Sequence, residues 1–136
     1  MGSGLSLITK YHKMFYKRHG YVVLQNQLCY NMKNKLKRLV NEIEQDSLRL
    51  RPEYSHKFEL NNEGKKRICR TEDLLKNPKM ENILTSGLLP AFISKVNGKQ
   101  VTLFKEKINY KYPNTGGYKP HQDITAYPNS RSHITA

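Results

Sequence analysis

The stretch that decides the fold runs from residue 100 to residue 128 and reads QVTLFKEKINYKYPNTGGYKPHQDITAYP. Its first part, residues 100–112, predicts a long β-strand, in which side chains two residues apart share a face. One predicted face is mostly apolar and aromatic: Thr102, Phe104, Glu106, Ile108, Tyr110 and Tyr112. The other face carries most of the polar residues: Val101, Leu103, Lys105, Lys107, Asn109 and Lys111.

The polar face of this strand has two interpretations. Antiparallel sheets often leave one face in water, so the lysines can simply be solvated. Alternatively, the face lines the interior of a barrel and binds an anion there. The strand alone does not decide between the two.

A His-x-Asp motif follows the strand and the glycine-rich loop of residues 113–117. In an extended chain, His121 and Asp123 point to the same side, so a ring nitrogen and a carboxylate oxygen can bind one metal ion at adjacent positions. The pair would supply two of the three ligands of a 2-His-1-carboxylate site, which holds non-haem Fe(II) and leaves positions open. A lone motif of this kind also occurs by chance.

Two amphipathic helices are predicted in the first third of the chain. Apolar residues recur at helical spacing across residues 5–18, and His19-Gly20 is a typical helix end. The same spacing predicts a helix over residues 28–46, with its lysines on the opposite face. Cys29 lies on the apolar stripe of this second helix, so we expect it in the core as a small hydrophobic residue.

The remaining residues before residue 100 predict shorter elements. Short strands are expected over residues 21–24 and around Phe58. The TED sequence of residues 71–73 fits a helix start with acidic residues in the first turn, and residues 72–96 then predict short helices. Three histidines are expected at the surface or at helix ends: His12, His19 and His56.

Composition narrows the class of protein. The chain has 136 residues, enough for one domain, and 37% hydrophobic residues, enough for a modest core. No apolar stretch approaches the length of a transmembrane helix. Two cysteines without a CxxC motif exclude a disulfide framework and a Cys-rich zinc module, so we expect free thiols and a cytoplasmic location.

The net charge of +13 raises the question of an anionic partner. Its basic clusters fit either a solvated lysine-rich face or a nucleic-acid surface. The sequence contains no RNP, KH, zinc-finger or helix-turn-helix motif, so nucleic acid is not the expected partner. The charge also attracts small anionic ligands over long distances.

The two ends of the chain are expected to lie outside the domain. Residues 1–7 are expected to be flexible and lack a secretory signal. They fit both the N-myristoylation motif at Gly2 and a cloning remnant. Residues 129–136 are expected to form a polar tail.

Several motifs together resemble the phytanoyl-CoA dioxygenase family. They are the FKEKINYKYP sequence of residues 104–113, the Gly116-Gly117 loop, the His121-Gln122-Asp123 motif and Tyr127-Pro128. The GYVVL sequence of residues 20–24 also resembles the N-terminal strand of that family. The resemblance covers residues 8–128, which we expect to be the N-terminal part of such a domain.

This resemblance implies an α+β fold: an incomplete double-stranded β-helix, or jelly roll, with N-terminal helices packed on its sheet. It implies an Fe(II)- and 2-oxoglutarate-dependent oxygenase that hydroxylates a small organic substrate and releases succinate and CO2. His121 and Asp123 would hold the iron. Lys107, Asn109 and Lys111 are the candidates to bind the co-substrate carboxylates, because they share a face and precede the metal motif.

The sequence also departs from the family pattern. The second histidine ligand and a following arginine lie well downstream in the family, whereas only 13 residues follow Asp123 here, with Arg131 before His133. We therefore expect the chain to be inactive alone, and a second chain could complete the barrel. The alternatives are a non-catalytic binding module and a basic nucleic-acid-binding domain.

Overall fold

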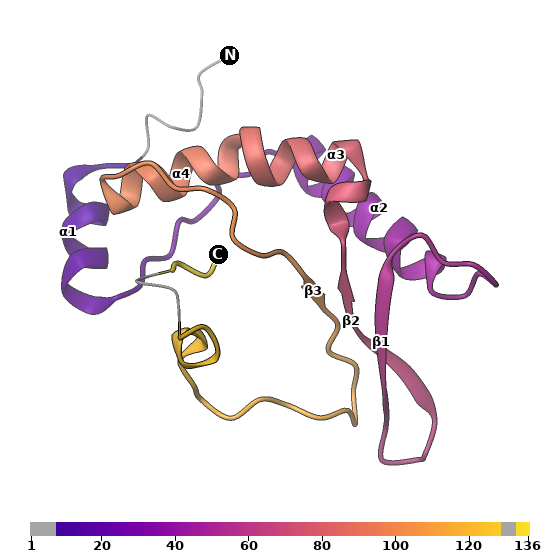
Figure 1. The fold of residues 1–136 in the computed structure, drawn as a ribbon. Helices are drawn as coiled ribbons and strands as arrows, with labels where there is room; N and C mark the ends of the chain where they lie inside the picture. The colour runs from indigo at the N-terminus through magenta and orange to yellow at the C-terminus, as the bar shows by residue number, and fades with distance from the viewer. Residues whose placement is uncertain (1–7, 129–132) are drawn as a thin grey trace.

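The computed structural model describes residues 8–128 and 133–136. The expected flexibility of residues 1–7, the Gly2 motif and Arg131 lie outside these residues. The elements follow in the order α1 (Lys10–His19), α2 (Tyr30–Asp46), β1 (Ser55–Leu60), β2 (Lys66–Glu72), η2 (Leu74–Lys76), α3 (Pro78–Glu81), the π-helical turn η3 (Asn82–Ser86), α4 (Leu88–Asn97), β3 (Ile108–Asn109) and η4 (Asp123–Ala126). The chain is thus an α+β protein (Figure 1).

Helix α1 begins and ends as its sequence predicts. Thr9 and His12 form a capping box, in which the Thr9 side chain accepts from the His12 backbone and the His12 ring accepts from the Thr9 backbone. Gly20 ends the helix with a φ of 77°, a left-handed conformation that glycine adopts without strain. His12 and His19 therefore lie at the two ends of α1, as expected.

Helix α2 buries one stripe but not Cys29. Leu39, Ile43 and Asp46 are its buried residues. Cys29 is exposed at the N-cap, because the helix begins only at Tyr30, so its predicted core position is wrong.

The sheet has three antiparallel strands in the order β1–β2–β3. The strand expected around Phe58 is confirmed as β1. The helix start expected at residues 71–73 is partly confirmed: Asp73 is the N-cap of η2, the first of the expected short helices, but Thr71 and Glu72 complete β2 and pair with β1. Residues 21–24 form no strand; Val22 and Leu24 pack instead against the core beside α4.

The long strand predicted over residues 100–112 is only partly confirmed. Only Ile108 and Asn109 pair in the sheet, with Thr71 and Arg70 of β2. The predicted alternation of faces nevertheless holds from Ile108 to Tyr112: Tyr110 is buried, whereas Asn109 and Lys111 are exposed. Figure 1 shows β3 beside β2, with a wide loop leading on to η4.

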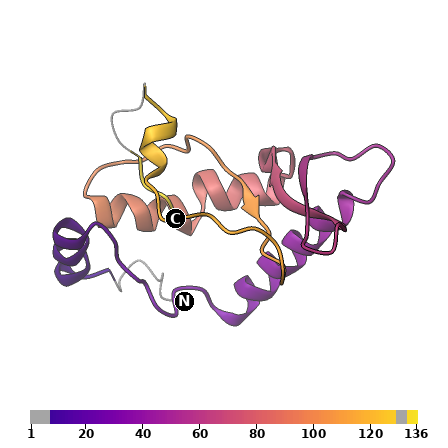
Figure 2. The same cartoon turned by 90° about the horizontal axis from the view of Figure 1, so that it is seen from below.

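Among the described residues, the buried apolar side chains form two clusters. Helix α1 and the sheet, which contribute to different clusters, lie at opposite ends of the ribbon (Figure 2). One cluster joins α2 to the sheet and the short helices: Leu39, Ile43, Tyr54, Leu74 and Met80. The other joins α4 to the residues that flank α1: Ile8, Phe92 and Val96. Ile108 packs against the first cluster, which fixes the start of the segment that leads to the His-x-Asp motif.

Candidate functional site

The His-x-Asp motif places its two side chains together. Gln122 between them has extended backbone angles, φ −107° and ψ 122°, so His121 and Asp123 project to the same side. His121 Nε2 lies 3.1 Å from Asp123 Oδ1, and the two side chains are 54% and 33% exposed. The same-side geometry predicted from the spacing is therefore present, at a surface that a ligand can reach.

The hydrogen bonds of His121 leave its Nε2 directed at the carboxylate. Nδ1 donates to the Lys119 carbonyl oxygen at 2.7 Å, which orients the ring. In a neutral ring, Nε2 then carries a lone pair that faces Asp123 Oδ1, and two lone pairs at this distance repel. A positive charge, either a proton on Nε2 or a shared metal ion, relieves the repulsion.

The donor set fits two positions of a metal site. Ligand atoms about 2.1 Å from a first-row divalent metal and at right angles to each other lie about 3.0 Å apart. The His121–Asp123 separation of 3.1 Å matches this spacing. Within residues 8–128 and 133–136, no group of three His, Cys, Asp or Glu side chains gathers to hold a metal ion.

The charge of Asp123 is stabilised by its neighbours. The Thr135 hydroxyl donates to Asp123 Oδ2 at 3.2 Å. This hydrogen bond, opposed by partial desolvation and assisted by the charges of Lys107 and His121, lowers the pKa of the Asp123 carboxyl below its usual value. The charge of Lys107 thus favours the ionised form of Asp123, and the Thr135 hydroxyl contacts this carboxylate although no sequence pattern identified it.

The other two candidates to bind the co-substrate, Lys111 and Asn109, have no direct contact with the His121–Asp123 pair among the described interactions. Lys111 Nζ lies 4.2 Å from the centroid of the Tyr118 ring and donates to the Gly116 carbonyl at 3.3 Å. The Tyr118 ring in turn lies 5.9 Å from that of His121. Lys111 is therefore linked to the pair through Tyr118, an aromatic residue that sequence reasoning did not select. Asn109 is exposed opposite Arg70.

His133 lies near the same region through aromatic contacts. Its ring packs edge-on against Tyr127 at 5.8 Å, and Tyr127 packs edge-on against Phe104 at 5.1 Å. These contacts bring residues 133–136 back toward the segment that carries the motif.

His56 was expected at the surface or at a helix end, and this prediction is wrong. Its side chain is 2% exposed and its Nε2 lies 3.1 Å from Asp46 Oδ2. The sequence of β1 does not identify this position, because both polar partners of His56 are distant in sequence.

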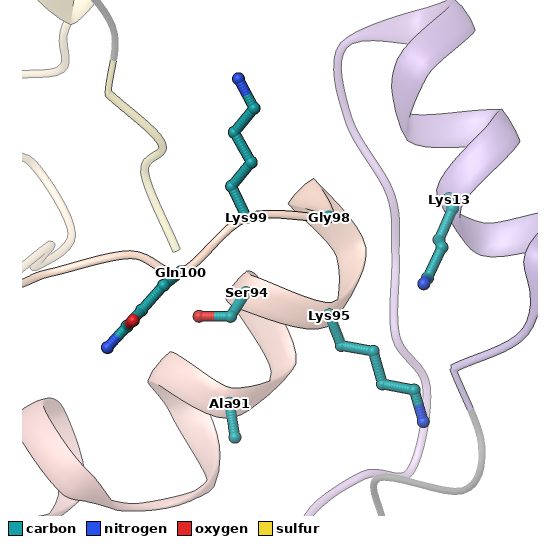
Figure 3. Close-up of a pocket in the computed structure, with 7 residues that line it drawn as sticks. All are labelled: Lys13, Ala91, Ser94, Lys95, Gly98, Lys99 and Gln100. Carbon is teal, nitrogen blue, oxygen red and sulfur yellow. The ribbon is translucent and has the colours of Figure 1, made fainter.

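A second candidate is an open depression of about 540 Å³ between α1 and the end of α4. Three lysines line it: Lys13, Lys95 and Lys99. Figure 3 shows that they do not point to a common centre, because Lys99 extends away from Lys95. The depression also lies at the C-terminal end of α4, where the helix dipole disfavours an anion. The His121–Asp123 pair is therefore the stronger candidate.

No helix in the described parts of the chain is long and apolar enough to cross a lipid bilayer.

The sequence is similar to a known protein family and to several characterised proteins. Residues 16–136 match the family described as phytanoyl-CoA dioxygenase (PhyH). A methylphosphonate hydroxylase from Gimesia maris is 43% identical over 83 residues, which cover 60% of this chain and 32% of that protein. A 2-aminoethylphosphonate dioxygenase from an uncultured bacterium is 36% identical over 75 residues, 53% of this chain and 29% of that protein.

A third relative aligns over more of the chain. Dioxygenase lolE1 from Epichloe uncinata is 32% identical over 116 residues, 83% of this chain and 44% of that protein. The alignments thus span less than half the length of each of these relatives. No solved structure matches the chain significantly.

Proposed function

Since the chain belongs to the phytanoyl-CoA dioxygenase family, we propose that it carries part of the active site of an Fe(II)- and 2-oxoglutarate-dependent dioxygenase. The reaction consumes O2 and 2-oxoglutarate, hydroxylates a small organic substrate, and releases succinate and CO2. The observation that carries the proposal is the exposed His121–Asp123 pair, whose atoms lie 3.1 Å apart.

Each residue of the site has a separate task. His121 Nε2 and Asp123 are the iron ligands, and the Lys119 carbonyl holds the His121 ring in place. Bound Fe(II) supplies the oxidation chemistry together with 2-oxoglutarate. Lys107, Asn109 and Lys111 bind the co-substrate carboxylates. The two lysines do so through charge-assisted hydrogen bonds, which are the strong ones, and Asn109 through its amide N–H groups. The charge that Lys107 exerts on Asp123 supports its place near the iron.

A small phosphonate is the first substrate class to test. The proteins named methylphosphonate hydroxylase and 2-aminoethylphosphonate dioxygenase are both similar to this chain. The net charge of +13 supports an anionic substrate, because it attracts anions during encounter.

We further propose that the site is completed by residues beyond those described. Two protein ligands hold Fe(II) weakly, and the three-stranded sheet is shorter than an eight-stranded jelly roll. A second chain that supplies further strands and a third ligand would complete both the barrel and the metal site, and the chain alone is then inactive. The free thiols of Cys29 and Cys69 support a reducing, cytoplasmic location, which a thiol titration of protein purified from its source would test.

The test is an anaerobic titration of the purified chain with Fe(II) and 2-oxoglutarate, monitored by the visible charge-transfer band of the chelate. We expect a weak band that disappears in His121→Ala and persists in His19→Ala, which removes a histidine at the end of α1. A folded wild-type chain that binds neither ligand, or a band unchanged in His121→Ala, would overturn the proposal. Binding to duplex DNA that weakens steeply with salt would favour the nucleic-acid alternative.

A further inference from the structure

A buried hydrogen-bond chain crosses the molecule outside the candidate site. It connects α2, β1, β2 and the residue after β3. Asp46 Oδ2 lies 3.1 Å from His56 Nε2, and His56 Nδ1 lies 2.8 Å from Thr71 Oγ1. The Thr71 hydroxyl donates to Tyr110 Oη at 3.3 Å. Asp46 and Thr71 are fully buried, and Tyr110 is 8% exposed.

The Asp46 carboxylate is the fixed end of this chain. Its Oδ2 also accepts from the backbone N–H groups of Glu53 at 2.7 Å and Tyr54 at 3.1 Å, and its Oδ1 lies 3.0 Å from the Arg49 guanidinium. Burial alone raises the pKa of this carboxyl, but the hydrogen bonds and the Arg49 charge outweigh burial and lower it. Asp46 is therefore a stable anion.

His56 joins the carboxylate to the two hydroxyl groups. Its Nε2 donates to the Asp46 carboxylate, which can only accept, and its Nδ1 is hydrogen-bonded to the Thr71 hydroxyl. The Thr71 hydroxyl is in turn hydrogen-bonded to Tyr110 Oη. The His56 ring is therefore held at both nitrogens.

The order carboxylate, imidazole, hydroxyl resembles the catalytic triad of a hydrolase. Thr71 is fully buried, so no substrate can reach its oxygen. A nucleophilic role is excluded, and the chain of hydrogen bonds must act through what it holds in place.

The hydrogen-bond chain holds the segment that carries Lys107 and Lys111, the two lysines proposed to bind the co-substrate. The Tyr110 backbone N–H donates to the Cys69 carbonyl at 3.0 Å, and its ring is anchored by Thr71. Tyr112 is tied to α2 as well, because its hydroxyl donates to Glu44. Lys111 lies between these two inward-facing tyrosines, so its side chain projects outward, over Tyr118.

We propose that Asp46, His56, Thr71 and Tyr110 are positioning residues, which hold residues 107–111 so that Lys107 and Lys111 face the anionic co-substrate. This inference rests on the proposed function for the identity of the ligand. The placement of Lys111 itself is independent of that function.

The first measurement therefore needs no ligand. In protein with 13C-dimethylated lysines, the Lys111 methyl signal is expected to be shifted upfield by the Tyr118 ring, and Lys111→Arg assigns it. Thr71→Val removes the hydroxyl that joins His56 to Tyr110 and is expected to abolish most of that upfield shift. Thr71→Ser keeps the hydroxyl and should retain it. Thr102→Val is the matched control, because Thr102 is exposed on the same segment.

The second measurement uses 2-oxoglutarate itself. Its Kd, measured with Fe(II) present, is expected to rise about fivefold in Thr71→Val, whereas the Kd for Fe(II) alone stays within about twofold. Tyr110→Phe keeps the ring in the core and provides the same test if Thr71→Val fails to fold.

The outcomes separate this inference from the proposed function. A wild-type chain that does not bind 2-oxoglutarate contradicts the proposed function and leaves the Lys111 signal as the test of positioning. A Lys111 signal unchanged in folded Thr71→Val and Tyr110→Phe would overturn the positioning role. If the signal moves but the Kd for 2-oxoglutarate does not, the link to the co-substrate is wrong.

Discussion

The part of the molecule that the structure describes contains two histidine–aspartate pairs with the same separation and opposite surroundings. His56 Nε2 lies 3.1 Å from Asp46 Oδ2, and His121 Nε2 lies 3.1 Å from Asp123 Oδ1. The side chains of the first pair are 2% and 0% exposed, whereas those of the second are 54% and 33% exposed. Distance alone therefore does not distinguish a buried structural pair from a pair that is open to ligands.

The difference lies in what else each pair contacts. Asp46 receives two backbone N–H groups, and the second nitrogen of His56 bonds to the Thr71 side chain, so the polar atoms of the buried pair are largely occupied. His121 Nδ1 donates to a backbone carbonyl, and its Nε2 faces Asp123 Oδ1 at a solvent-exposed position. An ion in solution can reach the exposed pair, whereas the buried pair is closed to it.

The largest expected effect comes from breaking the buried pair. Asp46→Asn removes a buried carboxylate that accepts from His56 Nε2 and from two backbone N–H groups, and we expect the free energy of unfolding to fall by about 3 kcal/mol. Urea unfolding followed by circular dichroism measures it. Asp73→Asn, which removes an exposed partner of Lys76, should cost less than about 1 kcal/mol. Equal losses in both variants would contradict the contrast.

Acid should lower the free energy of unfolding by protonating the Asp46 carboxylate. The folded-state pKa of Asp46 is lower than its ordinary value of 3.8. Its contribution to stability is therefore complete above about pH 4 and is lost as the pH falls through the folded-state pKa. We expect the urea midpoint to decline below about pH 4 in the wild type and to decline less in Asp46→Asn. Parallel curves for the two proteins would show that Asp46 is not responsible.

The sequence predicted local geometry well and distant pairing poorly. The helical stripe of α2 and the glycine end of α1 were predictable, because both follow from residues within a few positions of each other. The same-side placement of His121 and Asp123 also follows from their spacing of two. Strand β2 was missed because its KRICRTE sequence shows little alternation of apolar and polar residues.

The buried histidine was not predictable for a related reason. His56 is buried only because Asp46 and Thr71, on two other elements, supply its hydrogen bonds. Likewise, the alternation along residues 108–112 predicted which side chains face inward, but Thr102 and Phe104 of the predicted apolar face are exposed. The sequence also did not show how few residues pair, since pairing depends on β2. Whether the exposed pair binds iron stays a prediction, since no local pattern supplies the third ligand.

Chemical modification should distinguish the two histidines without any ligand. Diethyl pyrocarbonate attacks a neutral ring nitrogen that water can reach, so His121 should react at least about tenfold faster than His56. Peptide mass spectrometry after timed exposure measures both rates in one sample. His19, exposed at the end of α1, provides the reference for an accessible ring. Similar rates for His56 and His121 would mean that the core around His56 opens readily.

The smallest expected effect comes from the partner of His121 Nδ1. That partner is the backbone carbonyl of Lys119, which every residue type supplies, so Lys119→Ala should leave the proton on Nδ1. Two-bond 1H–15N spectra at alkaline pH, where the ring is neutral, report the tautomer directly. For His56 the corresponding partner is a side chain, so Thr71→Val should change its ring-nitrogen signals while Lys119→Ala does not change those of His121. A changed His121 tautomer in Lys119→Ala would show that the lysine side chain, rather than the backbone, orients the proposed iron ligand.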